Sequence, residues 1–232
     1  MFQVAYRHAR QFTLPLVLSM HHVDNRCTSS IGTCIAVNRD GWIVTALHIF
    51  ESFFAAALQK RALEERERSK AEIGRDPRLS QNERRKRLKA LGFPKPTDVS
   101  DVSLWPGRDG VNIVDIAGIR EIDLAWGRMV PFDSSWIPEY PVFQDLPESA
   151  ERAGTSLCRL GFPFHDITPT FDSSTRSFTL PPASFPLPLF PIEGMYTRNL
   201  ILDSVVPQSE IASYSMVCTN FRMLGRCLST WV

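Results

Sequence analysis

The chain of 232 residues lacks several features that mark specialised classes of protein. It has no run of about 18 apolar residues, which excludes a membrane-spanning helix. Its 26 basic and 25 acidic residues give a net charge of +1, so the whole molecule has no electrostatic preference for nucleic acid or for a membrane surface. Because 44% of the residues are apolar, the composition of a disordered chain is excluded too. Neither a nucleic-acid nor a membrane partner is expected.

The cysteines form neither a C-x-x-C pair nor a zinc-binding spacing, and they are Cys27, Cys34, Cys158, Cys218 and Cys227. An odd number of cysteines without such spacing favours reduced thiols and a cytoplasmic location. The N-terminus keeps a secreted or periplasmic alternative open, because Arg7 and Arg10 precede an apolar stretch over residues 12–20, as in a signal peptide. Pro15 interrupts this stretch, and we interpret it as the first strand.

Residues 31–50 contain the clearest local pattern. Two β-rich runs flank the sequence Asn-Arg-Asp-Gly over residues 38–41, which predicts a hairpin turn with Gly41 at a positive φ angle. The second run continues into Ala-Leu-His, so His48 is expected where a strand ends. We expect a packed hairpin, rather than a flexible loop, to hold this histidine.

A charged segment follows. An apolar periodicity that begins at Phe50 predicts an amphipathic helix, and residues 60–89 contain twelve basic and six acidic side chains. Gly74 and the following Asp-Pro pair predict the end of this helix. Ser-Gln-Asn-Glu over residues 80–83 is the pattern of a capping box that starts a second helix. We expect a solvated helical hairpin over about residues 50–92, inserted in a β protein, that serves as an arm or docks a protein partner.

Strand signals return after this segment, over residues 111–117, 122–126 and 155–161. The proline-punctuated polar stretch between the last two predicts a linker over residues 131–153. Five prolines within residues 180–191 predict a stiff extended loop.

Three motifs carry a resemblance to a known family. The sequence Gly-Thr-Cys-Ile-Ala-Val-Asn-Arg-Asp-Gly-Trp-Ile-Val-Thr-Ala-Leu-His, which ends at His48, resembles the histidine motif of trypsin-like serine proteases, especially those of the bacterial, HtrA-like type. Ile-Asp-Leu-Ala over residues 122–125 is similar to the aspartate motif of that family. Leu-Gly-Phe-Pro over residues 160–163 is similar to the turn that opens its second barrel.

The resemblance implies a serine endopeptidase that acts on polypeptides through a His-Asp-Ser mechanism, without a metal or an organic cofactor. His48 would be the general base, and Asp123 would orient it. Asp115, in the similar tripeptide Asp-Ile-Ala, is an alternative to Asp123. We prefer Asp123, because Asp115 falls within a short strand, whereas the predicted linker begins soon after Asp123 in the sequence.

The nucleophile of the family is not recognisable in this chain. The family places it in a Gly-x-Ser-Gly-Gly-Pro segment, whose glycines present backbone N–H groups to the developing oxyanion. No serine after residue 203 is followed by Gly-Gly, and the candidates are Ser204, Ser209, Ser213, Ser215 and Ser229. The only glycine among the last 29 residues is Gly225. We therefore expect a chain truncated before this motif that has very weak activity or none. The alternative is a non-catalytic protease-like module that binds polypeptides or a protein partner.

The fold implied by the resemblance is mainly β, a chymotrypsin-like double β-barrel. The first barrel would span residues 1–130 and carry the helical insertion, and an incomplete second barrel with an atypical tail would span residues 154–232. Open strand edges in an incomplete barrel predict self-association.

Overall fold

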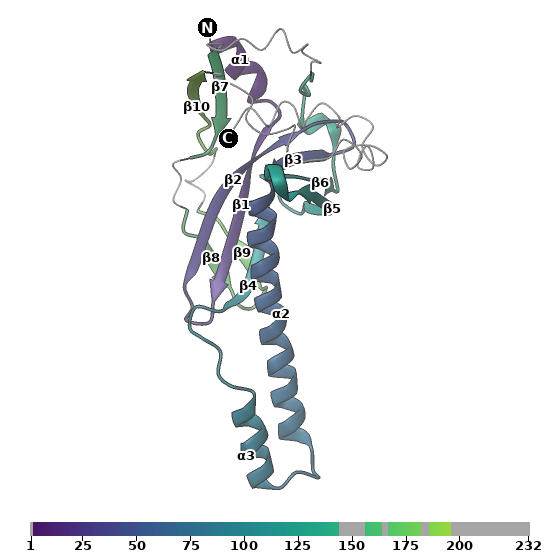
Figure 1. Ribbon diagram of the computed structural model, residues 1–232, viewed down its shortest axis with the longest axis vertical. Helices are drawn as coiled ribbons and strands as arrows, with labels where there is room; N and C mark the ends of the chain where they lie inside the picture. Colours follow the sequence, from purple (N-terminus) through teal and green to yellow (C-terminus); the bar gives the residue numbers. More distant parts are fainter. Residues whose placement is uncertain (1, 144–155, 164–166, 182–185, 196–232) are drawn as a thin grey trace.

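The centre of the protein is a six-stranded antiparallel sheet that curls into half a barrel (Figure 1). The computed structural model describes residues 2–143, 156–163, 167–181 and 186–195, over which the protein is mainly β. In the order β4-β1-β2-β3-β6-β5, neighbouring strands of this sheet are hydrogen-bonded. Its strands are β1 (Thr13–His22), β2 (Cys27–Ala36), β3 (Trp42–Ala46), β4 (Val99–Trp105), β5 (Asn112–Ile119) and β6 (Leu124–Val130).

The hairpin predicted between residues 31 and 46 is present. Strands β2 and β3 pair antiparallel, with Ile35 opposite Val44. Gly41 has a φ of 81°, in the left-handed region that favours glycine. The Asn38 side chain accepts hydrogen bonds from the backbone N–H groups of Asp40 at 3.1 Å and Trp42 at 3.2 Å, which stabilises the turn.

Two helices connect β3 to β4 and extend away from the sheet, as Figure 1 shows. We call α2 (Leu47–Arg75) and α3 (Gln81–Ala90) the helical arm. Helix α2 continues through Gly74 and ends just before the Asp-Pro pair. The predicted capping box is confirmed, because Ser80 and Glu83 exchange backbone–side-chain hydrogen bonds of 3.3 and 2.9 Å.

Arginine side chains hold the two helices of the arm together. Arg66 on α2 donates to the backbone carbonyl of Gly92 at 2.5 Å, and Arg84 on α3 donates to that of Asp76 at 2.6 Å. Both acceptors follow the end of a helix, where carbonyl groups lack an intrahelical partner. At the other end of the arm, Phe50 is completely buried and anchors α2 in the core.

The core lies between the curled sheet and the first turns of α2. Its completely buried apolar side chains include Leu16 on β1, Cys34 on β2 and Ile43 on β3. The structure adds α1 (Phe2–Ala9), which the sequence analysis did not predict, before a first strand that begins at Thr13. No helix in the described part of the chain is both long and apolar enough to cross a bilayer.

Smaller strand pairs accompany the main sheet. Strand β7 (Ser156–Gly161), predicted over residues 155–161, pairs antiparallel with β10 (Phe190–Met195). Strands β8 (Thr170–Asp172) and β9 (Ser177–Thr179) form a hairpin. Of the predicted proline-rich loop, residues 182–185 lie outside the described residues and residues 190–191 begin β10.

A stacked ring pair and an ionic cluster help to attach the β8–β9 hairpin to the main sheet. The Phe171 ring stacks on the imidazole of His21, with centroids 4.2 Å apart. Arg176 donates from Nη2 to Asp101 on β4 at 2.6 Å and to Glu64 on α2 at 3.2 Å. Asp101 is only 7% exposed, and these hydrogen bonds raise the pKa of the Arg176 guanidinium. The hairpin is therefore connected to both the sheet and the helical arm.

Candidate active site

His48 lies where β3 ends and α2 begins. Strand β3 is a central strand between β2 and β6, and its end is fixed by Thr45, whose hydroxyl donates to the carbonyl of Thr33 at 2.8 Å. Helix α2 starts at Leu47, so His48 is in its first turn. Placement between a central strand and an anchored helix restricts the backbone of His48 from both sides.

Asp123 reaches His48 from the neighbouring strand. It follows the short 3₁₀ turn Arg120–Ile122 and precedes β6, which pairs with β3. Its backbone is in the left-handed region, with φ 50° and ψ 39°, a conformation that aspartate tolerates better than most residues. The sequence analysis placed Asp123 within a strand and just before a linker. In the structure the strand begins later than predicted, because Asp123 ends the 3₁₀ turn and β6 starts at Leu124.

The structure brings His48 and Asp123 together, although they are 75 positions apart. Nδ1 of His48 lies 2.7 Å from Oδ2 of Asp123. The other carboxylate oxygen, Oδ1, accepts a hydrogen bond of 2.9 Å from the backbone N–H of His48. Since a carboxylate only accepts hydrogen bonds, the short Nδ1 contact places the ring proton on Nδ1. In a neutral ring, Nε2 then keeps its lone pair.

The ring of His48 is accessible from solvent. Its side chain is 67% exposed, and that of Asp123 is 49% exposed. Within the described residues, Nε2 has no hydrogen-bond partner, and the nearby hydroxyl of Ser52 donates to the backbone carbonyl of His48 at 2.8 Å instead of to the ring. A neutral imidazole in this state can accept a proton from a group that approaches Nε2.

Asp123 also stabilises the start of α2. The cap residue Ala46 has no side chain that could accept a hydrogen bond from the first turn. Asp123 supplies two acceptors from outside the helix, because its backbone carbonyl accepts from Leu47 N–H at 3.0 Å and its carboxylate accepts from His48 N–H. The negative charge also faces the positive end of the helix dipole. One residue thus orients the imidazole and caps the helix that carries it.

Two further features around the pair were not found by sequence reasoning. Gly118 on β5 allows α2 to start close to the sheet, since a Cβ there would lie 2.7 Å from the Leu47 side chain. Arg120 forms an ion pair of 2.7 Å with Glu51 and so joins the 3₁₀ turn to α2 a second time. The sequence signal for this ion pair is the position of its partners. Glu51 lies three residues after His48, and Arg120 lies three residues before Asp123.

The alternative carboxylate, Asp115, does not face His48. It accepts hydrogen bonds from Arg128 on the paired strand β6, at 3.0 Å from Nε and 2.9 Å from Nη2. Asp115 lies where the β5–β6 register shifts, and its φ is 53°. Of the two candidates from sequence, the structure therefore brings only Asp123 to the imidazole.

The remaining histidines have structural partners. His8 pairs with Glu139 at 2.6 Å, and His21 stacks on the β8–β9 hairpin as described above. His22 lies between Thr97 and Thr28, with hydrogen bonds of 3.0 and 2.9 Å. His165 and the five serines expected near the nucleophile position lie outside the described residues.

The described residues contain no group of three or more His, Cys, Asp or Glu side chains that could hold a metal ion. A scan against models of known protein families finds no match to this chain, and no curated protein matches it.

Proposed function

We propose that this protein is a trypsin-like serine endopeptidase domain, with His48 as the general base and Asp123 as the carboxylate that orients it. The single observation that carries the proposal is the Nδ1–Oδ2 contact of 2.7 Å between two residues that were selected from sequence motifs 75 positions apart. The second bond, from His48 N–H to Oδ1, restricts the carboxylate further. An imidazole held in this way directs Nε2 outward, where a serine hydroxyl could be deprotonated.

The proposed fold is the double β-barrel of that family. The half-barrel sheet of β1–β6 would be its first barrel, the helical arm an insertion into it, and β7 and β10 part of an incomplete second barrel. This division is supported by the positions of His48 and Asp123 on adjacent strands of one sheet and by the separate pairing of β7 with β10.

In the proposed reaction, His48 Nε2 accepts the proton of a serine hydroxyl as its oxygen attacks a peptide carbonyl. Asp123 stabilises the imidazolium that forms, and Nε2 then donates this proton to the departing amine. The sequence contains no Ser-Gly-Gly segment to build an oxyanion hole, and loss of a single oxyanion donor costs about 10²–10³ in rate. We therefore expect very weak hydrolysis, and the activity test must detect slow acylation.

A fluorophosphonate probe tests the proposal directly, because it reacts with a serine that a neighbouring base has activated. We expect slow labelling of the full chain that is lost in His48→Ala and in Asp123→Asn. The matched control is Asp115→Asn, which removes a carboxylate of the same motif type that pairs with Arg128 and not with His48. Labelled serines are identified by mass spectrometry.

The second candidate function is a non-catalytic module that binds polypeptides or a protein partner. It is favoured by the absence of a glycine after any candidate serine in residues 204–232. Labelling that is absent, or equal in wild type and His48→Ala, in samples with the same circular dichroism spectrum, would exclude the peptidase and leave this module.

A further inference from the structure

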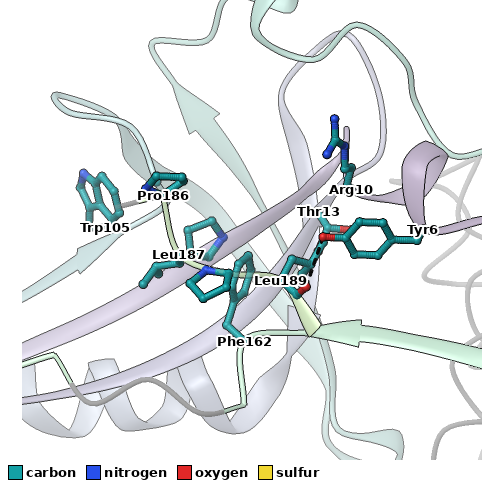
Figure 2. A pocket seen from close by; sticks show the side chains of 11 residues that line it. Tyr6, Arg10, Thr13, Trp105, Phe162, Pro186, Leu187 and Leu189 are labelled. Atoms are coloured by element: carbon teal, nitrogen blue, oxygen red, sulfur yellow. Dashed lines mark hydrogen bonds between the residues drawn. The ribbon is translucent and has the colours of Figure 1, made fainter. Parts of the chain in front are cut away.

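A pocket of about 510 Å³ is lined by residues that include neither His48 nor Asp123 (Figure 2). Four segments border it, which are residues 6–15 from α1 into β1, residues 105–107 at the end of β4, Phe162, and residues 186–189. The lining is largely apolar, with Tyr6, Trp105 and Phe162 contributing aromatic rings and the segment 186–189 contributing two prolines and two leucines. A volume in this range suits a small ligand, since ligand pockets typically measure about 300–1,000 Å³.

The polar groups of the pocket are few, and most are already engaged. The hydroxyl of Tyr6 donates to the carbonyl of Leu189 at 3.3 Å, as Figure 2 shows, and that of Thr13 donates to Ala9 at 2.7 Å. Arg10 is the single charged residue in the lining, and it is exposed. Among the described residues, its guanidinium has neither a hydrogen-bond nor an ion-pair partner. Among the described side chains that line the pocket, Arg10 is therefore the one with free donors, since the indole N–H of Trp105 donates to Asp109 at 2.9 Å.

These properties restrict the chemistry of a ligand. A guanidinium beside apolar walls attracts an anionic head on an apolar body. One positive charge balances the single charge of a carboxylate, whereas a phosphate monoester carries about −1.5 to −2 at neutral pH. A peptide is disfavoured, because each residue brings a backbone donor and acceptor that this lining would leave unsatisfied.

We propose that this pocket binds a small amphiphilic carboxylate, such as a medium-chain fatty acid, with its carboxylate on Arg10 and its apolar chain against Trp105, Phe162 and Leu187. The site is separate from the His48–Asp123 pair, so the proposal holds or fails independently of peptidase activity.

Isothermal titration calorimetry of the full chain with octanoate tests this assignment, with octan-1-ol as the uncharged analogue. We expect Arg10→Gln to weaken octanoate binding about 10-fold or more and to leave octanol binding unchanged. Arg7→Gln is the matched control, because Arg7 is an exposed arginine of α1 that does not line the pocket. Leu187→Asp is expected to weaken both ligands.

The indole N–H resonance of Trp105 reports whether the ligand occupies this pocket, and it should shift with octanoate in wild type and in Arg7→Gln. Absence of saturable octanoate binding to wild type would overturn the proposal, as would equal affinities for Arg10→Gln and Arg7→Gln. A peptide with an apolar C-terminal residue that binds through Arg10 more tightly than octanoate would also overturn it, in favour of a polypeptide ligand.

Discussion

At the scale of single residues, the orientation of the His48 ring depends on which atoms Asp123 presents to it. An aspartate presents only acceptors, so the ring proton must be on Nδ1. An asparagine at this position can keep its oxygen toward the backbone N–H of His48, but it then presents its NH₂ group to Nδ1. Nδ1 must then act as the acceptor, and the proton moves to Nε2, which can no longer act as a base.

We therefore predict that Asp123→Asn changes the tautomer of neutral His48 without unfolding the protein. Nitrogen-15 NMR of the imidazole distinguishes the two tautomers. We expect an Nδ1–H ring in wild type and in Asp115→Asn, and an Nε2–H ring in Asp123→Asn. An Nε2–H ring in the wild-type protein would contradict the geometry of the His48–Asp123 pair.

Cys34 provides a second prediction at this scale. It is completely buried, and burial raises the pKa of its thiol to about 12, whereas an unfolded cysteine titrates near 9.0. The folded state therefore keeps a proton that the unfolded state loses, and stability must fall as pH rises above 9.0. The slope contributed by Cys34 is roughly 1.4 kcal/mol per pH unit at most.

Urea unfolding between pH 8 and pH 11 measures this slope. Cys34→Ala should lower stability at pH 8 but should remove this part of the pH dependence. Cys27→Ala should keep it, although burial also raises the pKa of that partly exposed thiol. Equal slopes for wild type and Cys34→Ala would refute the prediction. In wild type, we also expect iodoacetamide to modify Cys27 before Cys34, because the thiolate is the reactive form.

At the scale of secondary structure, α3 depends on its own capping more than on packing. None of its side chains is buried, and its first turn is held by the exchange between Ser80 and Glu83. These hydrogen bonds lower the pKa of the Glu83 carboxyl, so the cap is complete above the ordinary pKa of a glutamate and is lost as pH falls through the lowered value.

Ser80→Ala should therefore accelerate amide hydrogen exchange in α3 by about five-fold, while the strands β1–β6 exchange at the wild-type rate. Gln81→Ala, one position later and outside the capping box, is the control. If exchange in α3 is unchanged in Ser80→Ala, the helix is held by another interaction.

The elements that could be predicted from sequence are those specified by adjacent residues. The turn at Gly41 and the capping box at Ser80 each depend on side chains that contact backbone groups within a few positions. Strand β4 was missed, because its polar residue Asp101 is buried through partners distant in the chain, Lys60 and Arg176, the latter 75 positions later. Helix α1 is short, and without an acidic residue in its first turn it offered no start signal.

For the candidate site too, the sequence predicted what local motifs specify and missed what depends on strand register. Motif resemblance identified both residues of the pair, but the choice between Asp123 and Asp115 depended on the register of β5 and β6. That register shifts between Val114 and Ala117, and local periodicity does not reveal such a shift. The pocket at Arg10 was beyond sequence reasoning, since it joins four segments that are distant in the chain.

At the scale of the whole molecule, one ionic cluster connects three parts of the fold. Arg176 joins the β8–β9 hairpin to β4 and α2, and Lys60 adds a contact of 3.4 Å to the same Asp101 carboxylate.

Helix α2 also exposes two apolar side chains, since Phe54 is 44% and Leu58 is 64% exposed. The self-association that the sequence led us to expect stays a prediction.

We predict that Arg176→Ala frees the β8–β9 hairpin and destabilises the protein by about 1–2 kcal/mol. This is less than the roughly 3–5 kcal/mol expected for breaking a fully buried pair, because Lys60 still neutralises Asp101 and Arg176 is partly exposed. Limited proteolysis should then cut between residues 172 and 177. Arg26→Ala removes a surface ion pair with Asp24 and should have little effect on either measurement. A hairpin equally resistant in Arg176→Ala and wild type would refute this prediction.

The double use of Asp123 has a consequence for the history of such a protein. A residue that is needed only for bond cleavage is free to change once cleavage is no longer selected. Asp123 is not free in this way, because a side chain without an acceptor would leave the N–H group of His48 unpaired where α2 begins. The bond from the Leu47 N–H to the backbone carbonyl of residue 123 would remain. Selection for folding alone would therefore keep a side chain with an acceptor at this position, and both aspartate and asparagine meet that requirement.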